Sequence, residues 1–313
     1  MTELVARARD GEARAVARLI SLVEDASPRL REVMAALSPH TGHAQVVGIT
    51  GAPGVGKSTC TNVLVTVLRA AGKRVGVLAV DPSSPFSGGA LLGDRVRMAD
   101  HALDRDVYIR SMASRGHLGG LAWTTPQAIR VLDAARCDVI LVETVGVGQS
   151  EIEVAGLADT TMVLLAPGMG DGIQAAKAGI LEVGDLYVVN KADRDGADQV
   201  SRELSSMLSL TERPASGWEP PVVMTVATAG DGLEEVTAEI DRHRAWLSET
   251  GELTTRRTRR ARSEIEAIAV TALRERWGDV QGRSELDTLA AVVAAGATDP
   301  YTAADELLAT VTH

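Results

Sequence analysis

The residues best suited to chemistry lie in one glycine-rich segment, residues 46–58, which reads VVGITGAPGVGKS. A short apolar run leads into the spacing G-x-x-x-x-G-K-S, which is set by Gly51, Gly56, Lys57 and Ser58. Glycines let the backbone curl so that several N–H groups point at one anion, and a following helix adds its partial positive charge. Lysine in this position reaches the β- and γ-phosphates, and the serine hydroxyl ligates Mg²⁺. The segment therefore predicts a P-loop that binds a nucleoside triphosphate with Mg²⁺.

The elements on either side of this loop support the prediction. A strand-like run precedes it and the helix-forming run TCTNVLVTVLRAAG follows it, which disfavours the alternative of a glycine-rich turn that matches by chance. We expect the nucleotide to contact the whole loop and the start of its helix, namely Gly51, Ala52, Pro53, Gly54, Val55, Gly56, Lys57, Ser58 and Thr59.

A second motif, Asn190-Lys191-Ala192-Asp193, follows the apolar run LYVV. An aspartate there accepts two hydrogen bonds from guanine N1–H and the 2-amino group, a pair that adenine does not offer. Asn190 either bonds the base edge or ties its own loop to the P-loop, and the Lys191 stem can lie over the base. Downstream, the backbone of Ala227 can contact the base oxygen. The combination predicts GTP and GDP as the ligands.

Three carboxylates are candidates for the metal site beside Ser58. Asp81 and Glu143 each end an apolar run, whereas Asp94 lies in the polar segment LLGDRVRM, where a helix cap or a solvated charge is an equal alternative. Lys57, Asp81 and Glu143 would assist hydrolysis of the γ-phosphate by positioning and charge stabilisation. No residue stands out as an arginine finger or general base, so we expect slow intrinsic turnover that a partner completes.

Strand-like and helix-like stretches alternate from residue 46 to residue 247, which is typical of an α/β fold with a mostly parallel sheet and helices on both faces. Strands are expected at 46–50, 75–80, 107–109, 139–142, 161–166, 186–189 and 222–225. Helices are expected at 57–71, 125–135, 172–182, 196–208 and 233–247. The ends are helical, which suggests an N-terminal arm at 1–44, a GTPase domain at 45–247 and a C-terminal arm at 248–313.

Composition excludes several classes of function. A net charge of −10 and 3% aromatic residues disfavour nucleic-acid binding, and no apolar run is long enough to span a membrane. The two cysteines, Cys60 and Cys137, are interpreted as buried apolar residues in a reducing, cytoplasmic setting. The arginine run at 256–262 is interpreted as the solvated entry to a helix.

Seven segments together resemble one family: GAPGVGKS, AVDPSSP, GDRVRM, SRGHLGGL, ETVGVGQSE, PGMGDGIQAAK and NKAD. They are similar to the MeaB/ArgK branch of the G3E P-loop GTPases, which includes the human methylmalonic aciduria type A protein. The resemblance is tight over residues 45–245. It implies that Ser58, Asp81, Asp94 and Glu143 surround the Mg²⁺.

The resemblance also implies a chaperone and gatekeeper for an adenosylcobalamin-dependent acyl-CoA mutase, usually methylmalonyl-CoA mutase. It implies mobile segments near 81–98, 143–155 and 167–178, with Lys177 linking the nucleotide state to the partner, and a homodimer made by the helical arms. Three alternatives stay open: a nucleotide-dependent kinase of an amino-acid transport system, a metallochaperone GTPase, and an interaction module with an inactive nucleotide site.

Overall fold

The computed structural model describes residues 1–82, 99–101, 103–114, 124–144, 150–168, 181–210, 217–277 and 284–311. The chain divides into two compact units, Met1–Arg256 and Arg257–His313. The three-part division expected from the sequence stays a prediction.

A parallel sheet of seven strands forms the centre of the first unit, in the order β3-β2-β4-β1-β5-β6-β7. All seven expected strands are confirmed: β1 Gln45–Gly51, β2 Val75–Pro82, β3 Val107–Ser114, β4 Val139–Thr144, β5 Thr160–Leu165, β6 Leu186–Asn190 and β7 Val222–Thr225. Every residue of β1, β4, β5 and β6 is buried, because helices cover both faces of the sheet.

Helices α4 (Lys57–Ala70) and α11 (Leu233–Thr250) pack together on one face. The opposite face carries α6 (Thr125–Ala134), α7 (Ser150–Leu157) and α10 (Ala197–Ser209). Short helices at η2 (Ala99–His101) and α9 (Leu181–Val183) complete the described connections. The helix expected at 172–182 lies largely outside the described residues.

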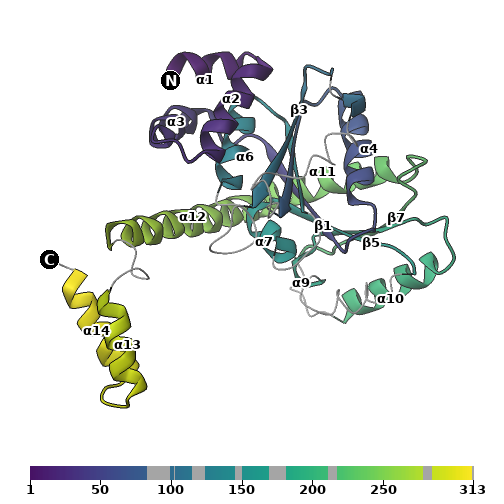
Figure 1. Cartoon of the computed structure of the whole chain (residues 1–313). Helices are drawn as coiled ribbons and strands as arrows, with labels where there is room; N and C mark the ends of the chain where they lie inside the picture. Colours follow the sequence, from purple (N-terminus) through teal and green to yellow (C-terminus); the bar gives the residue numbers. More distant parts are fainter. Residues whose placement is uncertain are drawn as a thin grey trace. The chain divides into compact units, whose positions relative to one another are not determined.

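The N-terminal helices are part of the core of the first unit. They comprise α1 (Thr2–Arg9), α2 (Ala13–Glu24), α3 (Leu30–Leu37) and the 3₁₀ turn η1 (Ser38–His40), and α1, α2 and α3 all contact α6 (Figure 1). Their apolar residues belong to the same buried cluster as Leu78 of β2 and Ile140 of β4. The helical N-terminus expected from the sequence is therefore stabilised by burial of its apolar residues against α6.

Helix α7 was not expected from the sequence. Its eight residues are too few for a clear helical period, and its position depends on a contact that is distant in the chain. A Cβ added to Gly48 of β1 would lie 2.8 Å from Val154 Cγ2, so the helix can pack this closely only where the strand lacks a side chain.

Aspartates fix the amino ends of the strands in a repeated arrangement. Asp138, Asp159 and Asp185 directly precede β4, β5 and β6. Their carboxylates accept the backbone N–H groups of Arg74 at 2.7 Å, Val46 at 3.1 Å and Thr161 at 2.9 Å, in that order. Each contact joins a strand to its neighbour in the sheet, and so fixes the register at the amino edge.

Asp185 also binds Arg256, which corrects one expectation. The Arg256 guanidinium donates to both carboxylate oxygens of Asp185 at 2.8 Å, so the first arginine of the 256–262 run is paired rather than solvated. Helix α12 (Glu252–Trp277) begins beside this ion pair and runs into the second unit, where α13 (Ser284–Ala294) and α14 (Pro300–Val311) pack on each other. Among the described residues, no helix combines the length and the apolar character that a membrane span requires.

Candidate nucleotide-binding site

The P-loop connects β1, the middle strand of the sheet, to α4. Gly51 has φ +140°, and a Cβ there would lie 2.3 Å from the carbonyl oxygen of Leu164. Gly56 has φ +101°, and a Cβ there would lie 2.4 Å from Asn190 Nδ2. Both glycines of the motif are therefore required by backbone conformation and by close neighbours.

The side chain of Lys57 lies back across this loop. It is 6% exposed, and its Nζ donates to the carbonyl oxygens of Gly51 at 2.6 Å and Ala52 at 3.0 Å. Because the ammonium group is held inside the curl of the backbone, the loop combines a fixed positive charge with the N-terminus of α4. This is the electrostatic environment that a polyphosphate needs.

Ser58 and Glu143 meet beside the loop. Ser58 Oγ donates to Glu143 Oε1 at 2.6 Å, and Glu143 is 6% exposed. The sheet register places Glu143 between Ile49 of β1 and Ala79 of β2, with Asp81 two residues farther along β2. Hydroxyl and carboxylate oxygens are the donors that Mg²⁺ prefers, so this pair fits the expected ion. Asp94 and Lys177 lie outside the described residues, and for Asp81 only the backbone is described.

The base motif packs against the loop through Asn190. This buried side chain donates from Nδ2 to the carbonyl oxygen of Val55 at 2.8 Å, and its Oδ1 accepts from Thr225 Oγ1 at 3.2 Å and Ala227 N at 3.1 Å. Of the two roles open for Asn190, the structure shows the tie to the P-loop. Thr225, which completes the contact, belongs to the segment TVAT, whose sequence is too degenerate to single it out.

Lys191 and Asp193 follow at the same edge of the sheet. Lys191 adopts φ +59°, and its Nζ donates to the carbonyl oxygen of Gly54 at 2.6 Å. Asp193 is exposed to solvent. The motif therefore holds the loop with two side chains and presents a solvated carboxylate two residues farther along the chain.

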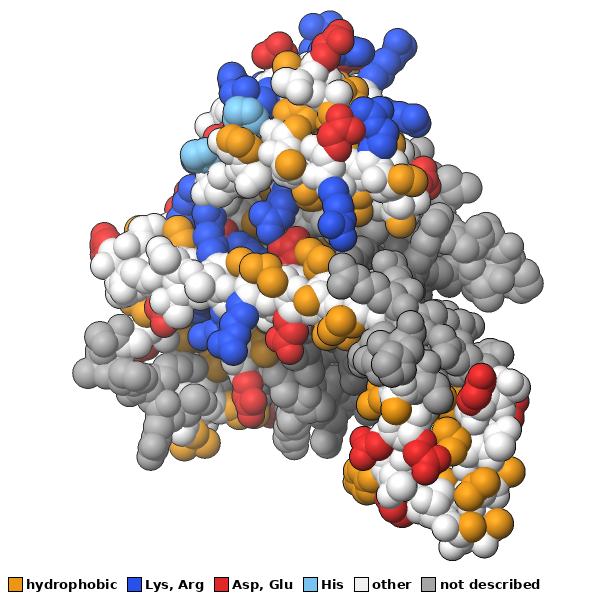
Figure 2. Space-filling view, turned by 90° about the vertical axis from the view of Figure 1, so that its left-hand side faces the viewer, with side chains coloured by type: hydrophobic (Ala, Val, Ile, Leu, Met, Phe, Trp, Pro, Cys, Tyr) orange, Lys and Arg blue, Asp and Glu red, His pale blue; other side chains and the backbone are white. Residues whose placement is uncertain are grey.

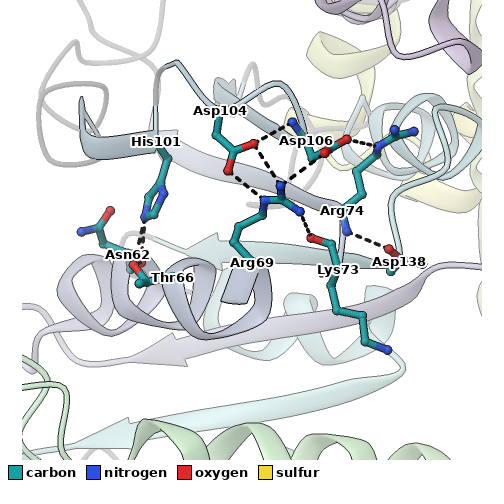
Figure 3. A network of polar contacts seen from close by, with 9 residues as sticks. All are labelled: Asn62, Thr66, Arg69, Lys73, Arg74, His101, Asp104, Asp106 and Asp138. Atoms are coloured by element: carbon teal, nitrogen blue, oxygen red, sulfur yellow. Dashed lines mark hydrogen bonds and ion pairs between the residues drawn. The ribbon is translucent and has the colours of Figure 1, made fainter. Parts of the chain in front are cut away.

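A network at the far end of α4 fixes that helix to the segment before β3 (Figure 3). Arg69 pairs with Asp104 at 2.8 Å and with Asp106 at 3.2 Å, and the hydrogen bond from Arg69 lowers the pKa of Asp104. His101 Nε2 lies 3.2 Å from Thr66 Oγ1. The helix that begins at the P-loop is thus anchored at its other end as well.

The two cysteines are buried free thiols. Burial raises the pKa of Cys60 to about 12, and the negative charge of Glu143 raises it further. Burial likewise raises the pKa of Cys137. Both thiols stay protonated at neutral pH, which confirms their interpretation as small apolar residues.

This fold and this site define a P-loop nucleoside triphosphatase. More narrowly, the chain belongs to the family described as methylmalonyl Co-A mutase-associated GTPase MeaB, whose family model matches residues 16–280. It is a GTPase of the MeaB/ArgK branch, as the sequence resemblance implied.

Relatives extend over almost the whole chain. A putative GTPase of Pyrococcus abyssi is 47% identical over 98% of this chain and 95% of its own length. The mouse protein named methylmalonic aciduria type A homolog, mitochondrial, is 35% identical over 95% of this chain and 76% of its own length. Among solved structures, one titled as an LAO/AO transport system kinase has a TM-score of 0.76 and 27% identity, and covers 99% of this chain and 97% of its own.

Proposed function

We propose that this GTPase is a chaperone and gatekeeper for an adenosylcobalamin-dependent acyl-CoA mutase, with methylmalonyl-CoA mutase as the first candidate. It would protect that enzyme and gate the loading of its cofactor. The description of the family and the name of the mouse relative support the proposal. We place the activity in the cytoplasm, where free thiols such as Cys60 and Cys137 stay reduced.

The P-loop residues 51–59 would hold the phosphates of GTP. Bound Mg²⁺ would neutralise charge on the β- and γ-phosphates, and Ser58 and Glu143 would hold it together with Asp81 and Asp94. Asp193 would select guanine, while Asn190 keeps the base motif against the loop and Ala227 contributes a backbone group. Lys177 would report the nucleotide state to the partner.

The contact between Ser58 and Glu143 carries the proposal of a nucleotide-controlled switch. Glu143 is directly bonded to the P-loop helix and stands near the end of β4, from which the chain continues toward α7. Loss of the γ-phosphate and its metal would change the partners of this carboxylate. A change at the phosphates would therefore move Glu143 and, through the chain that follows β4, the segment leading to α7. A partner that contacts this segment would then distinguish the two nucleotide states.

We also propose that the second unit makes a homodimer. Its helices α12 and α14 expose large apolar side chains, among them Ile265 at 67%, Leu273 at 46% and Tyr301 at 84% exposure. Replacing Ile265 and Leu273 together with glutamate should convert a dimer to monomers in light scattering. A dimer that persists would place the interface elsewhere.

The chaperone proposal is tested by adding a cobalamin-dependent mutase to the GTPase and measuring phosphate release. We expect about a tenfold or larger rise in turnover, because a partner completes the site. Retention of the mutase on the immobilised protein should differ between GDP and a non-hydrolysable GTP analogue. No retention in either state would overturn the proposal and leave the GTPase intact. Transfer of labelled γ-phosphate to a protein would instead favour the kinase alternative.

A further inference from the structure

A cavity lies in the first unit at the amino edge of the sheet, away from the P-loop. Its volume is about 450 Å³, within the range of roughly 300–1,000 Å³ that is usual for small-molecule sites. Residues that precede β1, β2 and β4 line it, together with the end of α1 and part of α11. Six of its lining side chains are basic: Arg9, His40, His43, Lys73, Arg136 and Arg244.

Figure 2 shows a face of the molecule on which Lys, Arg and His side chains gather. Three aspartates also line the cavity, but two of them are occupied by backbone donors. Asp133 accepts the N–H groups of His43 at 3.2 Å and Ala44 at 3.0 Å, and Asp138 accepts that of Arg74 at 2.7 Å. These two carboxylates are hydrogen-bonded in the wall. With Asp241, the lining holds three carboxylates against the four Lys and Arg side chains, so its formal charge is +1 with the histidines neutral.

Two of the cations are available for a ligand. Within the described part of the chain, neither Lys73 nor Arg136 forms an ion pair. The other cations help to build the wall, because Arg9 Nη1 lies 3.3 Å from His40 Nε2 and Arg244 donates to the carbonyl oxygen of His43 at 3.0 Å.

Arg136 occupies a backbone conformation that does not suit it. It has φ +63° one residue beyond Ala135, the C-cap of α6. Its N–H donates to the carbonyl oxygen of Asp133 at 2.9 Å, and the N–H of Cys137 donates to the carbonyl oxygen of Leu132 at 3.1 Å. Glycine is favoured at this position because it carries no Cβ. Arginine costs conformational energy at this position, and its side chain lines the cavity. This combination indicates that the charge of Arg136 has a role in binding.

We propose that this cavity binds a phosphate-bearing small molecule, at a site separate from the nucleotide loop. Arginine forks match phosphate oxygens in pairs, and lysine adds a point charge. The volume exceeds what a single small anion needs and suits a ligand of nucleotide or coenzyme size. The inference does not depend on the chaperone function, since it rests only on residues of the amino edge.

The test uses the full chain loaded with one equivalent of GDP and freed of excess nucleotide, so that the P-loop is occupied while no free GDP competes for the cavity, and pyrophosphate in magnesium-free buffer as the probe. Calorimetry should show one further binding event. Arg136→Gly should weaken it by about fivefold through the loss of one charge, while the melting temperature stays equal or rises, because glycine suits the cap. Lys73→Met should weaken it by a similar factor.

Arg18→Ala, on the exposed face of α2, is the matched control and should leave pyrophosphate binding unchanged. Absence of binding to the GDP-loaded chain would overturn the proposal. Equal affinity in the wild type, Arg136→Gly and Lys73→Met would overturn it as well, because binding would then occur elsewhere.

Discussion

The two edges of the central sheet satisfy the backbone in opposite ways. At the amino edge, carboxylates of Asp138, Asp159 and Asp185 accept backbone N–H groups at or just before the starts of neighbouring strands. At the carboxyl edge, the cationic and amide groups of Lys57, Lys191 and Asn190 donate to carbonyl oxygens of the P-loop. The three aspartates thus use backbone N–H donors, whereas the three side chains that contact the P-loop use its carbonyl acceptors.

This difference favours a nucleotide site at the carboxyl edge. When side chains hold the loop by its carbonyl oxygens, the N–H groups are what the curl presents to an anion. An aspartate at the same place would occupy those N–H groups and repel phosphate. Hydrogen bonds between side chains and the backbone therefore stabilise the fold at one edge and prepare the loop for ligand binding at the other.

Lys57→Ala is the strongest test of this comparison. We expect it to lower GTP affinity by about a thousandfold, or about 4 kcal/mol, because a buried charge-assisted contact to phosphate is lost. Titration with a fluorescent GTP analogue measures the change. Arg18→Ala again serves as control. Affinity within about threefold of wild type would show that the loop is not the phosphate site.

The carboxyl edge could be predicted from the sequence because its groups are contiguous. The loop 51–58 and the motif at 190–193 are each recognised by the spacing of residues within one short segment. An apolar run before each motif predicts the strand that leads to it. The resemblance of seven such segments to the MeaB/ArgK branch also predicted the family.

The amino edge could not be predicted in the same way. Its cavity draws on Arg9, Lys73, Arg136 and Arg244, which lie far apart in the chain and carry no shared pattern. The strand-preceding aspartates do leave a trace, since Asp before an apolar run recurs in CDVILV, ADTTMV and GDLYVV. Helix α7 was missed because a distant glycine, Gly48, decides where it packs.

We expect His243 to make the amino edge sensitive to acid. It is fully buried, its Nδ1 lies 2.9 Å from Thr160 Oγ1, and it stacks on Trp246 with ring centres 5.8 Å apart. Burial lowers its pKa to about 4, against an opposing effect of Asp185. The unfolded chain therefore binds a proton that the folded chain does not, in the window between about pH 6.5 and pH 4.

Stability should consequently fall as the pH falls through that window, by at most about 3 kcal/mol. Urea denaturation at a series of pH values measures it. His243→Gln removes the titrating group and should flatten the profile there. If stability fell equally steeply with pH in the variant, the acid sensitivity would come from other groups, and His243 would not be its cause.

Asp193→Asn gives the smallest effect and acts on the carboxyl edge alone. The variant loses the carboxylate that would accept guanine N1–H and the 2-amino group, so GTP should bind about 30-fold more weakly, or about 2 kcal/mol. Xanthosine triphosphate, whose 2-oxo group accepts from an amide, should gain over GTP in direct competition. Asp193 is exposed, so the free energy of unfolding should stay within about 0.5 kcal/mol of wild type. If GTP remained preferred, the base would have to be chosen by another group, and the division of labour between Asn190, which holds the loop, and Asp193, which selects the base, would fail.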